Sequence, residues 1–329
     1  MLRILHDTNY DFIRWWRWAV GLTVAFIILG LGSFLFRGIN YSIEFTGGTL
    51  MQLEFSKPVD VAALRMRLDR AGIRGAEIQQ FGTNREFTIR AQEAEGVGTG
   101  RTGAEGVSRR VQDVLEAEFG KGNFRIVRTE AVGPRVGGEL RRDALIAMLL
   151  SFLVTTVYLA IRFEWRFGVA ALIATGHDVL TTIAFLKLMH LEVSLTVVAA
   201  ILTVIGYSLN DTIIIFDRVR ENLRKGRKES LRDTLNRSIN ETLPRSVLTH
   251  ATTLAATLAL LFFAGEVIRP FAWVMAFGIF TGTFSSIYIA SPVLLWIERR
   301  WPRRIGAFQS SSTATRTSQT RRSPARAAR

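Results

Sequence analysis

Residues 193–216 have the sequence VSLTVVAAILTVIGYSLNDTIIIF, an apolar run that contains a single acid, Asp211. A helix needs about 20 apolar residues to cross the roughly 30 Å of hydrocarbon in a membrane. The run therefore predicts a membrane-spanning helix, and similar runs occur at five other places along the chain. The sequence thus predicts an α-helical polytopic membrane protein with six transmembrane helices.

The predicted spans divide the chain into segments of very different length. The six spans are 15–36, 143–161, 167–188, 193–216, 246–264 and 271–297. The resulting domains are an N-terminal segment 1–14, the first span, an insert 37–140, a bundle 141–300 with a basic loop 217–245, and a tail 301–329. The first run lacks a small-residue cleavage site, so we expect it to be retained as a helix. The tail is poor in apolar residues, and we expect it to be disordered against anionic lipid headgroups.

Composition excludes several classes of function. The net charge is +14, but most of the clustered Arg and Lys residues lie just outside apolar segments, as in membrane proteins. No nucleic-acid-binding motif accompanies them, so we expect no nucleic acid partner. The chain has no cysteine, and its four histidines are too scattered for a metal site. No Gly-rich phosphate loop is present. We therefore expect no enzyme activity, no cofactor and no metal, and an energy source other than ATP.

Positive charge in the short loops predicts the orientation. The charged loops hold Arg162, Arg166, a basic cluster within 218–237, Arg299 and Arg300. The alternate loops are poor in positive charge, with Lys187 and Arg269. The positive-inside rule places both termini in the cytoplasm, and the long insert 37–140 is then periplasmic.

The insert 37–140 has the pattern of a small α+β domain. Residues 50–55, 77–81, 86–90 and 124–130 have strand patterns, whereas 59–71 and 107–119 have helical spacing, and a Gly-rich loop spans 96–106. The order βαββαβ predicts a ferredoxin-like fold. This fold is too common to reveal a function.

Asp211 is the first candidate for a functional residue. It has apolar residues on both sides, with Asn210 as a polar neighbour. An acid within a membrane is costly unless it is paired, protonated or facing water, so it is a functional candidate by default. The alternative is a structural polar contact between helices.

Arg245 enters the fifth span at a depth comparable with Asp211, since the fourth and fifth spans run antiparallel. Burial favours the protonated form of an acid and a nearby guanidinium favours the ionised form, so such a pair can respond to a proton. The alternative is that Arg245 extends to the headgroups. Pro244 can kink or start the helix, and the depth of Arg245 depends on which of the two it does.

The third and sixth spans hold the remaining candidates. His177 and Asp178 lie near the middle of the third span, where they can carry a proton or form a local hydrogen-bonded contact between helices. His250, in the fifth span, is expected to be structural, with a proton relay as the alternative. Gly278 and Gly282 form a small-residue face, which favours close helix packing over a substrate path.

Four stretches resemble the SecF group of the SecD/SecF family. They are GINYSIEFTGGT at 38–49, VGP at 132–134, GYSLNDTIIIFDRVREN at 206–222 and GTFSSIYIASP at 282–292. The resemblance covers residues 15–300. Glu44 stands where the family usually has Asp, and Pro244 and His250 stand where small polar residues are common.

The resemblance implies a role in protein export, as half of a twelve-helix assembly with SecD in the resistance-nodulation-division superfamily. By resemblance, the partners are SecD, the SecYEG translocon, YajC, YidC and the translocating preprotein, in the bacterial inner membrane. It also implies that the proton gradient drives the late stage of export, with Asp211 as the proton-carrying acid, Arg245 as its switching partner, and His177 and Asp178 in support. The residues alone leave open whether the ion is H⁺ or Na⁺.

Two other functions remain possible from the residues. One is half of a small-molecule or lipid exporter of the same superfamily, although the small insert argues against it. The other is a membrane assembly scaffold whose buried acids are only structural.

Overall fold

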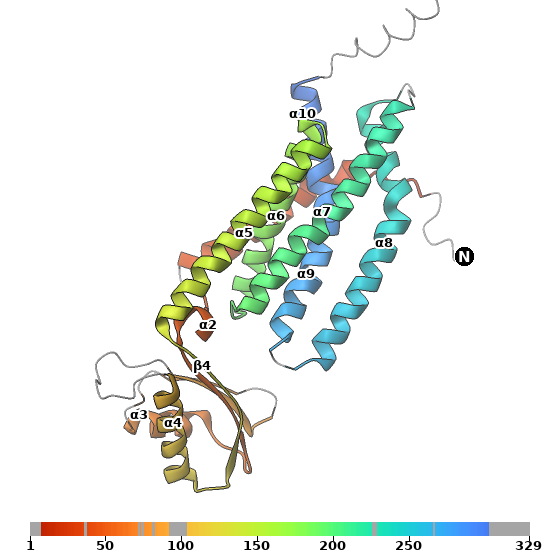
Figure 1. Cartoon of the computed structure of the whole chain (residues 1–329). Coiled ribbons are helices and arrows are strands. Elements are labelled where there is room, and N and C mark those ends of the chain that lie inside the picture. The colour runs from red at the N-terminus through yellow and green to blue at the C-terminus, as the bar shows by residue number, and fades with distance from the viewer. Residues whose placement is uncertain are drawn as a thin grey trace, which may run out of the picture.

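The computed structural model describes residues 8–35, 38–71, 73, 76–80, 83–91, 104–225, 229–265 and 267–302. Six apolar helices form a bundle, and an α/β domain lies at one end of it (Figure 1). The predicted fold class is therefore confirmed. Most of the Gly-rich loop 96–106 and most of the tail 301–329 lie outside the described residues.

The six apolar helices begin or end several residues beyond most of the predicted spans. The first comprises η1 (Phe12–Trp15), α1 (Trp16–Gly32) and η2 (Ser33–Leu35), and the next four are α5 (Pro134–Arg162), α6 (Trp165–Leu188), α7 (Leu195–Arg224) and α8 (Leu231–Phe263). The sixth comprises α9 (Arg269–Ser285), the π-helix η3 (Ser286–Ala290) and α10 (Ser291–Arg300).

The basic segment 217–245 is mostly helical, whereas we expected a loop. α7 continues to Arg224, and α8 begins after Ser230, whose Oγ accepts a hydrogen bond of 3.2 Å from the N–H of Asp233. Pro244 lies inside α8 and does not start it. Charged side chains connect the two helices here, and Arg218 Nε donates to Glu241 Oε2 at 2.6 Å. These contacts extend both helices beyond their apolar parts.

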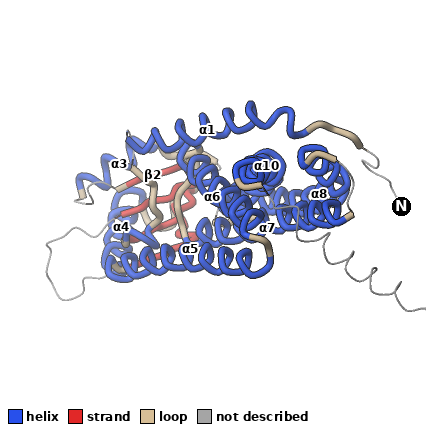
Figure 2. Tube along the Cα trace, turned by 90° about the horizontal axis from the view of Figure 1, so that it is seen from above, coloured by secondary structure: helices blue, strands red, loops and turns tan. Residues whose placement is uncertain are grey.

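Three helices form the centre of the bundle. In the most apolar 18-residue stretch of each helix, the share of buried residues is 50% for α6, 56% for α7 and 67% for the α9–α10 segment. The corresponding share is only 11% for the segment with α1, 6% for α5 and 17% for α8. Seen from above, α1 and α5 lie on opposite sides of α6 (Figure 2). The central helices therefore hold the buried polar residues, and the outer helices expose apolar surface.

The α/β domain has a single four-stranded sheet. Its elements are β1 (Gly48–Phe55), α3 (Val61–Arg70), β2 (Glu77–Gln80), β3 (Glu86–Ala91), α4 (Ala104–Phe119) and β4 (Phe124–Val132). The strands are antiparallel in the order β2-β3-β1-β4, and Leu53 pairs with Phe87 in the register of β1 and β3. Both side chains are fully buried with Leu64 of α3 and Leu115 of α4. This confirms the predicted βαββαβ order.

A short helix, α2 (Ile43–Thr46), which we did not predict, joins the bundle to the domain. Gly47 and Gly48 follow it with φ of 74° and 125°, which explains why both positions favour glycine. α5 packs closely against this corner, because a Cβ on Gly137 would lie 2.9 Å from the nitrogen of Gly47. The domain is thus attached to the bundle through α2 as well as through the chain connections.

Candidate functional site

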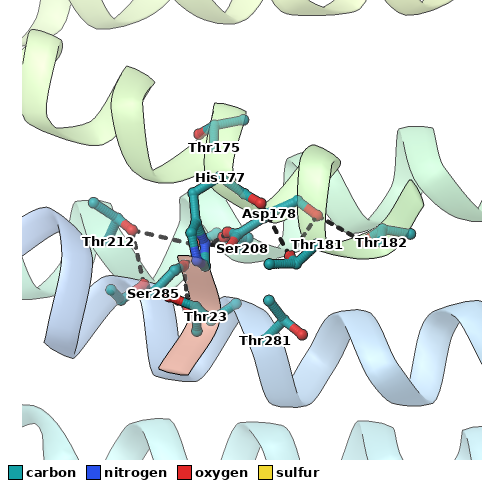
Figure 3. Close-up of polar contacts among 12 residues, drawn as sticks. Thr23, Thr175, His177, Asp178, Thr181, Thr182, Ser208, Thr212, Thr281 and Ser285 are labelled. Atoms are coloured by element: carbon teal, nitrogen blue, oxygen red, sulfur yellow. Dashed lines mark hydrogen bonds and ion pairs between the residues drawn. The ribbon is translucent and has the colours of Figure 1, made fainter. Parts of the chain in front are cut away.

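Asp178 lies in the middle of α6 and has no exposed surface. One carboxylate oxygen accepts hydrogen bonds from the hydroxyls of Ser208 on α7 and Ser285 on α9, the latter at 2.7 Å. The other oxygen lies 3.1 Å from Nδ1 of His177. Figure 3 shows these side chains converging from three helices. Asp178 is therefore fully surrounded by donors, as a buried carboxylate requires.

His177 is the one member of this cluster with an unused polar atom. Its Nε2 is buried and has no hydrogen-bond partner among the described residues. A histidine with one nitrogen against a carboxylate and the other unoccupied can take up or pass on a proton. The structure thus brings His177 and Asp178 together as a pair that links α6 to α7 and α9.

Asp211 on α7 is also buried, with 3% exposure, but it has fewer partners. Oδ1 accepts a hydrogen bond of 2.5 Å from the hydroxyl of Ser246 on α8. Oδ2 is buried and has no partner among the described residues. An unpaired carboxylate oxygen in an apolar interior is unfavourable, so Asp211 requires either a proton or a donor from another molecule.

His250 lies beside the partner of Asp211. Its Nδ1 is 2.5 Å from the carbonyl oxygen of Ser246, and its ring meets that of Tyr207 edge to face, with centroids 5.4 Å apart. Since a carbonyl only accepts, this contact places a proton on Nδ1. Tyr207 in turn donates to Thr253 Oγ1 at 3.1 Å. α7 and α8 are therefore joined by polar contacts around Asp211 that include His250.

Two consecutive serines lie between Asp178 and the residue that follows Asp211. Ser285 donates to Asp178, and Oγ of Ser286 lies 2.7 Å from Oγ1 of Thr212, the residue after Asp211. The π-helix η3 begins at Ser286, and π-helical turns often occur at functional sites. The junction of α9 and η3 thus contacts Asp178 directly and the neighbour of Asp211.

Arg245 does not contact Asp211 in this structure, where Ser246 is the partner of that acid; of the two arrangements left open by the sequence, this favours the one in which Arg245 points away. Its side chain is exposed, and it forms no ion pair with another described residue. Successive residues of a helix point about 100° apart, and Ser246, not Arg245, points at Asp211. Asn210 is exposed for the same reason, because its neighbour Asp211 points inward. Asn210 on α7 and Arg245 on α8 are thus both exposed, next to the two residues that contact each other.

Gly278 and Gly282 of α9 face α7. A Cβ on Gly282 would lie 2.9 Å from Cβ of Ser208, and one on Gly278 would overlap the side chain of Val204. The two helix backbones therefore approach closely, and this approach positions Ser285 against Asp178.

The sequence did not point to Ser208, Ser246, Ser285 or Ser286. Serine and threonine in apolar helices commonly bond their own backbone, as Thr181 does with the carbonyl of His177. Only the packing of the helices distinguishes a serine that contacts an acid. Within the described part of the chain, no group of three or more acidic or histidine side chains could hold a metal ion.

Two family profiles match this chain. The profile described as "Protein export membrane protein SecD/SecF, C-terminal" matches residues 111–300, and the profile "SecD/SecF GG Motif" matches residues 32–59. The second match includes α2 and the two glycines with positive φ.

Curated relatives and solved structures agree with these profiles. The chain is 62% identical over 305 residues to "Protein translocase subunit SecF" of Gemmatimonas aurantiaca, covering 92% of this chain and 91% of the relative. It is 38% identical over 286 residues to the protein of the same name from Escherichia coli O157:H7, covering 87% of each.

Among solved structures, it is similar to the crystal structure of SecDF, a translocon-associated membrane protein from Thermus thermophilus, with a TM-score of 0.79 and 37% identity. A second structure, SecDF in a super-membrane-facing form, gives a TM-score of 0.65 at 36% identity. The chain spans 40% and 41% of these two SecDF chains.

Proposed function

The chain belongs to the SecD/SecF family of protein export membrane proteins, and on this premise we propose that it is the SecF subunit of a protein translocase driven by the proton gradient. The proposal that a proton gradient drives the protein rests on Asp211, a buried acid. One of its carboxylate oxygens accepts a hydrogen bond from Ser246, and the other has no hydrogen-bond partner among the described residues. Uptake of a proton at the unoccupied oxygen removes the unfavourable charge, and its release restores it.

This change can drive a conformational cycle. One proton crossing 100 mV supplies about 2.3 kcal/mol, which shifts a two-state equilibrium roughly fifty-fold. The charge on Asp211 acts directly on the α7–α8 contact through Ser246. Protonation and release at this acid therefore alternately weaken and strengthen one helix contact of the bundle.

Arg245 keeps a role in the proposal, although it does not contact Asp211 within this chain. Arg245 is exposed on α8 next to Ser246, and Asn210 is exposed on α7 next to Asp211. Ser246 and Asp211 contact each other. A charged side chain exposed on an apolar helix is best satisfied by a partner helix. We place the proposed SecD half of the complex on this face.

The proposed complex follows the two-part architecture of the solved SecDF chains. This chain spans about two fifths of their length, so a second membrane half has to be supplied by SecD. SecYEG and the translocating preprotein are further proposed partners, and YajC and YidC are proposed from family resemblance alone. The proposal assigns no catalytic activity, metal or cofactor to the chain, and it takes H⁺ instead of Na⁺ as the coupling ion.

The proposed orientation is a bacterial inner membrane with the α/β domain in the periplasm and both termini in the cytoplasm. Basic residues support it, because the end of the bundle away from the domain carries Arg162, Arg166, Arg299 and Arg300. Positive residues in short loops mark the cytoplasmic side.

Asp211→Asn tests the proposal in membrane vesicles that contain SecYEG and SecD. We would measure completion of preprotein transport with and without an imposed proton gradient. The matched control is Asp217→Asn, which removes an exposed acid from the same helix. Amounts of this chain and its association with SecD are checked in each preparation.

Loss of the gradient's benefit in Asp211→Asn alone supports proton coupling at this acid. If Asp211→Asn keeps the full benefit, the acid is structural and the chain serves as a scaffold. If a sodium gradient replaces the proton gradient without loss, the coupling ion in the proposal is wrong.

A further inference from the structure

The segment 8–15, which precedes and begins the first membrane helix, is held against α8 by two asparagine side chains. The amide of Asn240 accepts from the N–H of Tyr10 and donates to its carbonyl oxygen, both at 2.9 Å. Oδ1 of Asn236 accepts from the N–H of Ile13 at 3.1 Å. Because Asn236 and Asn240 are four residues apart, they lie on one face of α8. The main chain of the segment is thus bound along the first half of α8 (Figure 2).

The side chains of the same segment pack into the centre of the bundle. Ile13 is 3% exposed and belongs to the same apolar cluster as Leu235 of α8. The ring of Phe12 meets that of Tyr288 in η3 edge to face, with centroids 6.4 Å apart. The segment 8–15 therefore contacts both α8 and the π-helix η3.

The orientation of α8 depends on its first half. Most of its buried residues lie between Thr234 and Ser246, and beyond Ser246 only Thr257 and Leu261 of this helix are buried. The helix is also weak at one turn, because Pro244 has no N–H to donate to the carbonyl oxygen four residues earlier. The direction of the remaining part of α8 is therefore set by contacts that the first half makes with other segments.

Two segments contact this first half from opposite sides. α7 contacts it through Asn222, which donates to Ser238 at 3.0 Å and to Glu241 at 2.7 Å. The segment 8–15 contacts it through Asn236 and Asn240. Positions 238 and 240 lie about 200° apart around the axis of a helix. The two sets of contacts therefore oppose rotation of α8 about its axis.

We propose that the segment 8–15 is an intramolecular clamp that fixes the rotation of α8 and thereby directs Ser246 at Asp211. Its positioning residues are Asn236 and Asn240. Among the described residues, Ser246 is the hydrogen-bond donor to Asp211, and a rotation of α8 by about 100° would exchange it for a neighbouring residue. The functional part of this inference rests on the proposed role of Asp211, whereas the clamp itself does not.

Thiol crosslinking between α7 and α8 in the purified full chain tests the clamp directly. The chain has no cysteine, so an introduced pair supplies its only thiols. Tyr207→Cys is combined either with Thr253→Cys, at the position that Tyr207 contacts at 3.1 Å, or with Thr252→Cys at the exposed position next to it. A short bifunctional thiol reagent gives the ratio of the two yields. Asn240→Ala should lower the ratio of 253 to 252 crosslinks roughly tenfold, because each lost hydrogen bond is worth a factor of about two to ten.

Asn9→Ala is the matched control, because Asn9 is an exposed amide of the same segment whose side chain forms no hydrogen bond with another described residue. Its crosslink ratio should equal that of the parent pair. An unchanged ratio in Asn240→Ala would overturn the clamp, whatever the role of Asp211. If Asn240→Ala does not fold, Asp11→Ala provides the same test at the surface, since Asp11 accepts from Asn236 at 2.8 Å.

Preprotein transport in vesicles that contain SecYEG and SecD tests the functional part. Asn240→Ala should reduce the benefit of the proton gradient as Ser246→Ala does, and transport without the gradient should be unchanged. The double variant should lose no more than Ser246→Ala alone, because Asn240 acts through Ser246.

Additive losses in the double variant would overturn the positioning role of Asn240. If neither Ser246→Ala nor Asp211→Asn reduces the benefit of the gradient, the proposed coupling is wrong. The crosslink ratio still decides the clamp in that case, so the two failures are distinguishable.

Discussion

The carboxylate of Glu44 in α2 accepts a hydrogen bond of 2.6 Å from the backbone N–H of Leu195, the first residue of α7. The first N–H groups of a helix have no partner within it, and a carboxylate there also interacts favourably with the helix dipole. Ser194 caps the same helix end, with Oγ accepting from the N–H of Val197 at 3.3 Å. The segment that enters the α/β domain thus stabilises the start of the helix that carries Asp211.

Glu44→Ala should lower the stability of the purified chain by about 1 kcal/mol, the usual cost of losing a helix cap. Glu44→Gln should cost less, because an amide oxygen still accepts the bond while the charge is lost. Thermal unfolding in detergent measures both. Glu139→Gln, an exposed acid on α5, is the control and should have little effect. An unchanged stability in Glu44→Ala would mean that Ser194 suffices as the cap.

Arg90 on β3 joins the sheet to the loop between α6 and α7. It pairs with Glu192 of that loop and donates to the carbonyl oxygen of Tyr41 at 3.3 Å, and its side chain is only 13% exposed. We expect Arg90→Glu to loosen the attachment of the domain, and Arg90→Glu with Glu192→Arg to restore part of it. The coupling energy should be about 1 kcal/mol, reduced by solvent at the more exposed Glu192.

Protease sensitivity of the chain between bundle and domain, combined with thermal unfolding, measures this coupling. The control pair is Arg125 and Glu54, which lie 2.8 Å apart on the same sheet but are 75% and 44% exposed. Its double-mutant coupling should be smaller. Equal coupling energies in the two pairs would show that Arg90 and Glu192 form an ordinary surface ion pair.

Ser285→Ala should destabilise the bundle by about 1–2 kcal/mol, because it removes a donor from the buried carboxylate of Asp178. Thr252→Ala is the control, since that hydroxyl is exposed and bonds only the backbone of its own helix. Chemical or thermal unfolding in detergent distinguishes them. If Ser285→Ala is as stable as Thr252→Ala, the hydrogen bond from Ser208 alone satisfies that oxygen of Asp178.

Gly282→Ala should destabilise the contact between α9 and α7 by about 1–3 kcal/mol, since the new Cβ would meet Ser208 at 2.9 Å in a packed interface. Gly176→Ala on α6 is the matched control, because a Cβ there would meet no side chain and no other helix within 4 Å. Thermal unfolding compares the two variants. Equal stability of the variants would show that α9 can shift to accommodate the methyl group.

Most of the architecture could be predicted from the sequence, since six apolar runs and one βαββαβ pattern each have a direct physical cause. The helix ends were predicted less well. Residues 217–245 are polar, and hydropathy assigns such residues to a loop, whereas side-chain contacts such as Arg218 with Glu241 keep them helical. The helix α2 was missed because it is a single turn whose partners lie on α5 and at Val193.

The sequence by itself identified Asp178 and Asp211 as unusual, because a carboxylate in an apolar helix is costly wherever it lies. It did not determine what contacts them. Arg245 and Ser246 are neighbours in the chain and were equally available to Asp211, and the rotation of α8 directs only Ser246 toward it. Hydropathy depends on residue types along one segment, whereas the direction of each side chain depends on how α7, α8 and α9 pack against one another, and only the tertiary structure decides this.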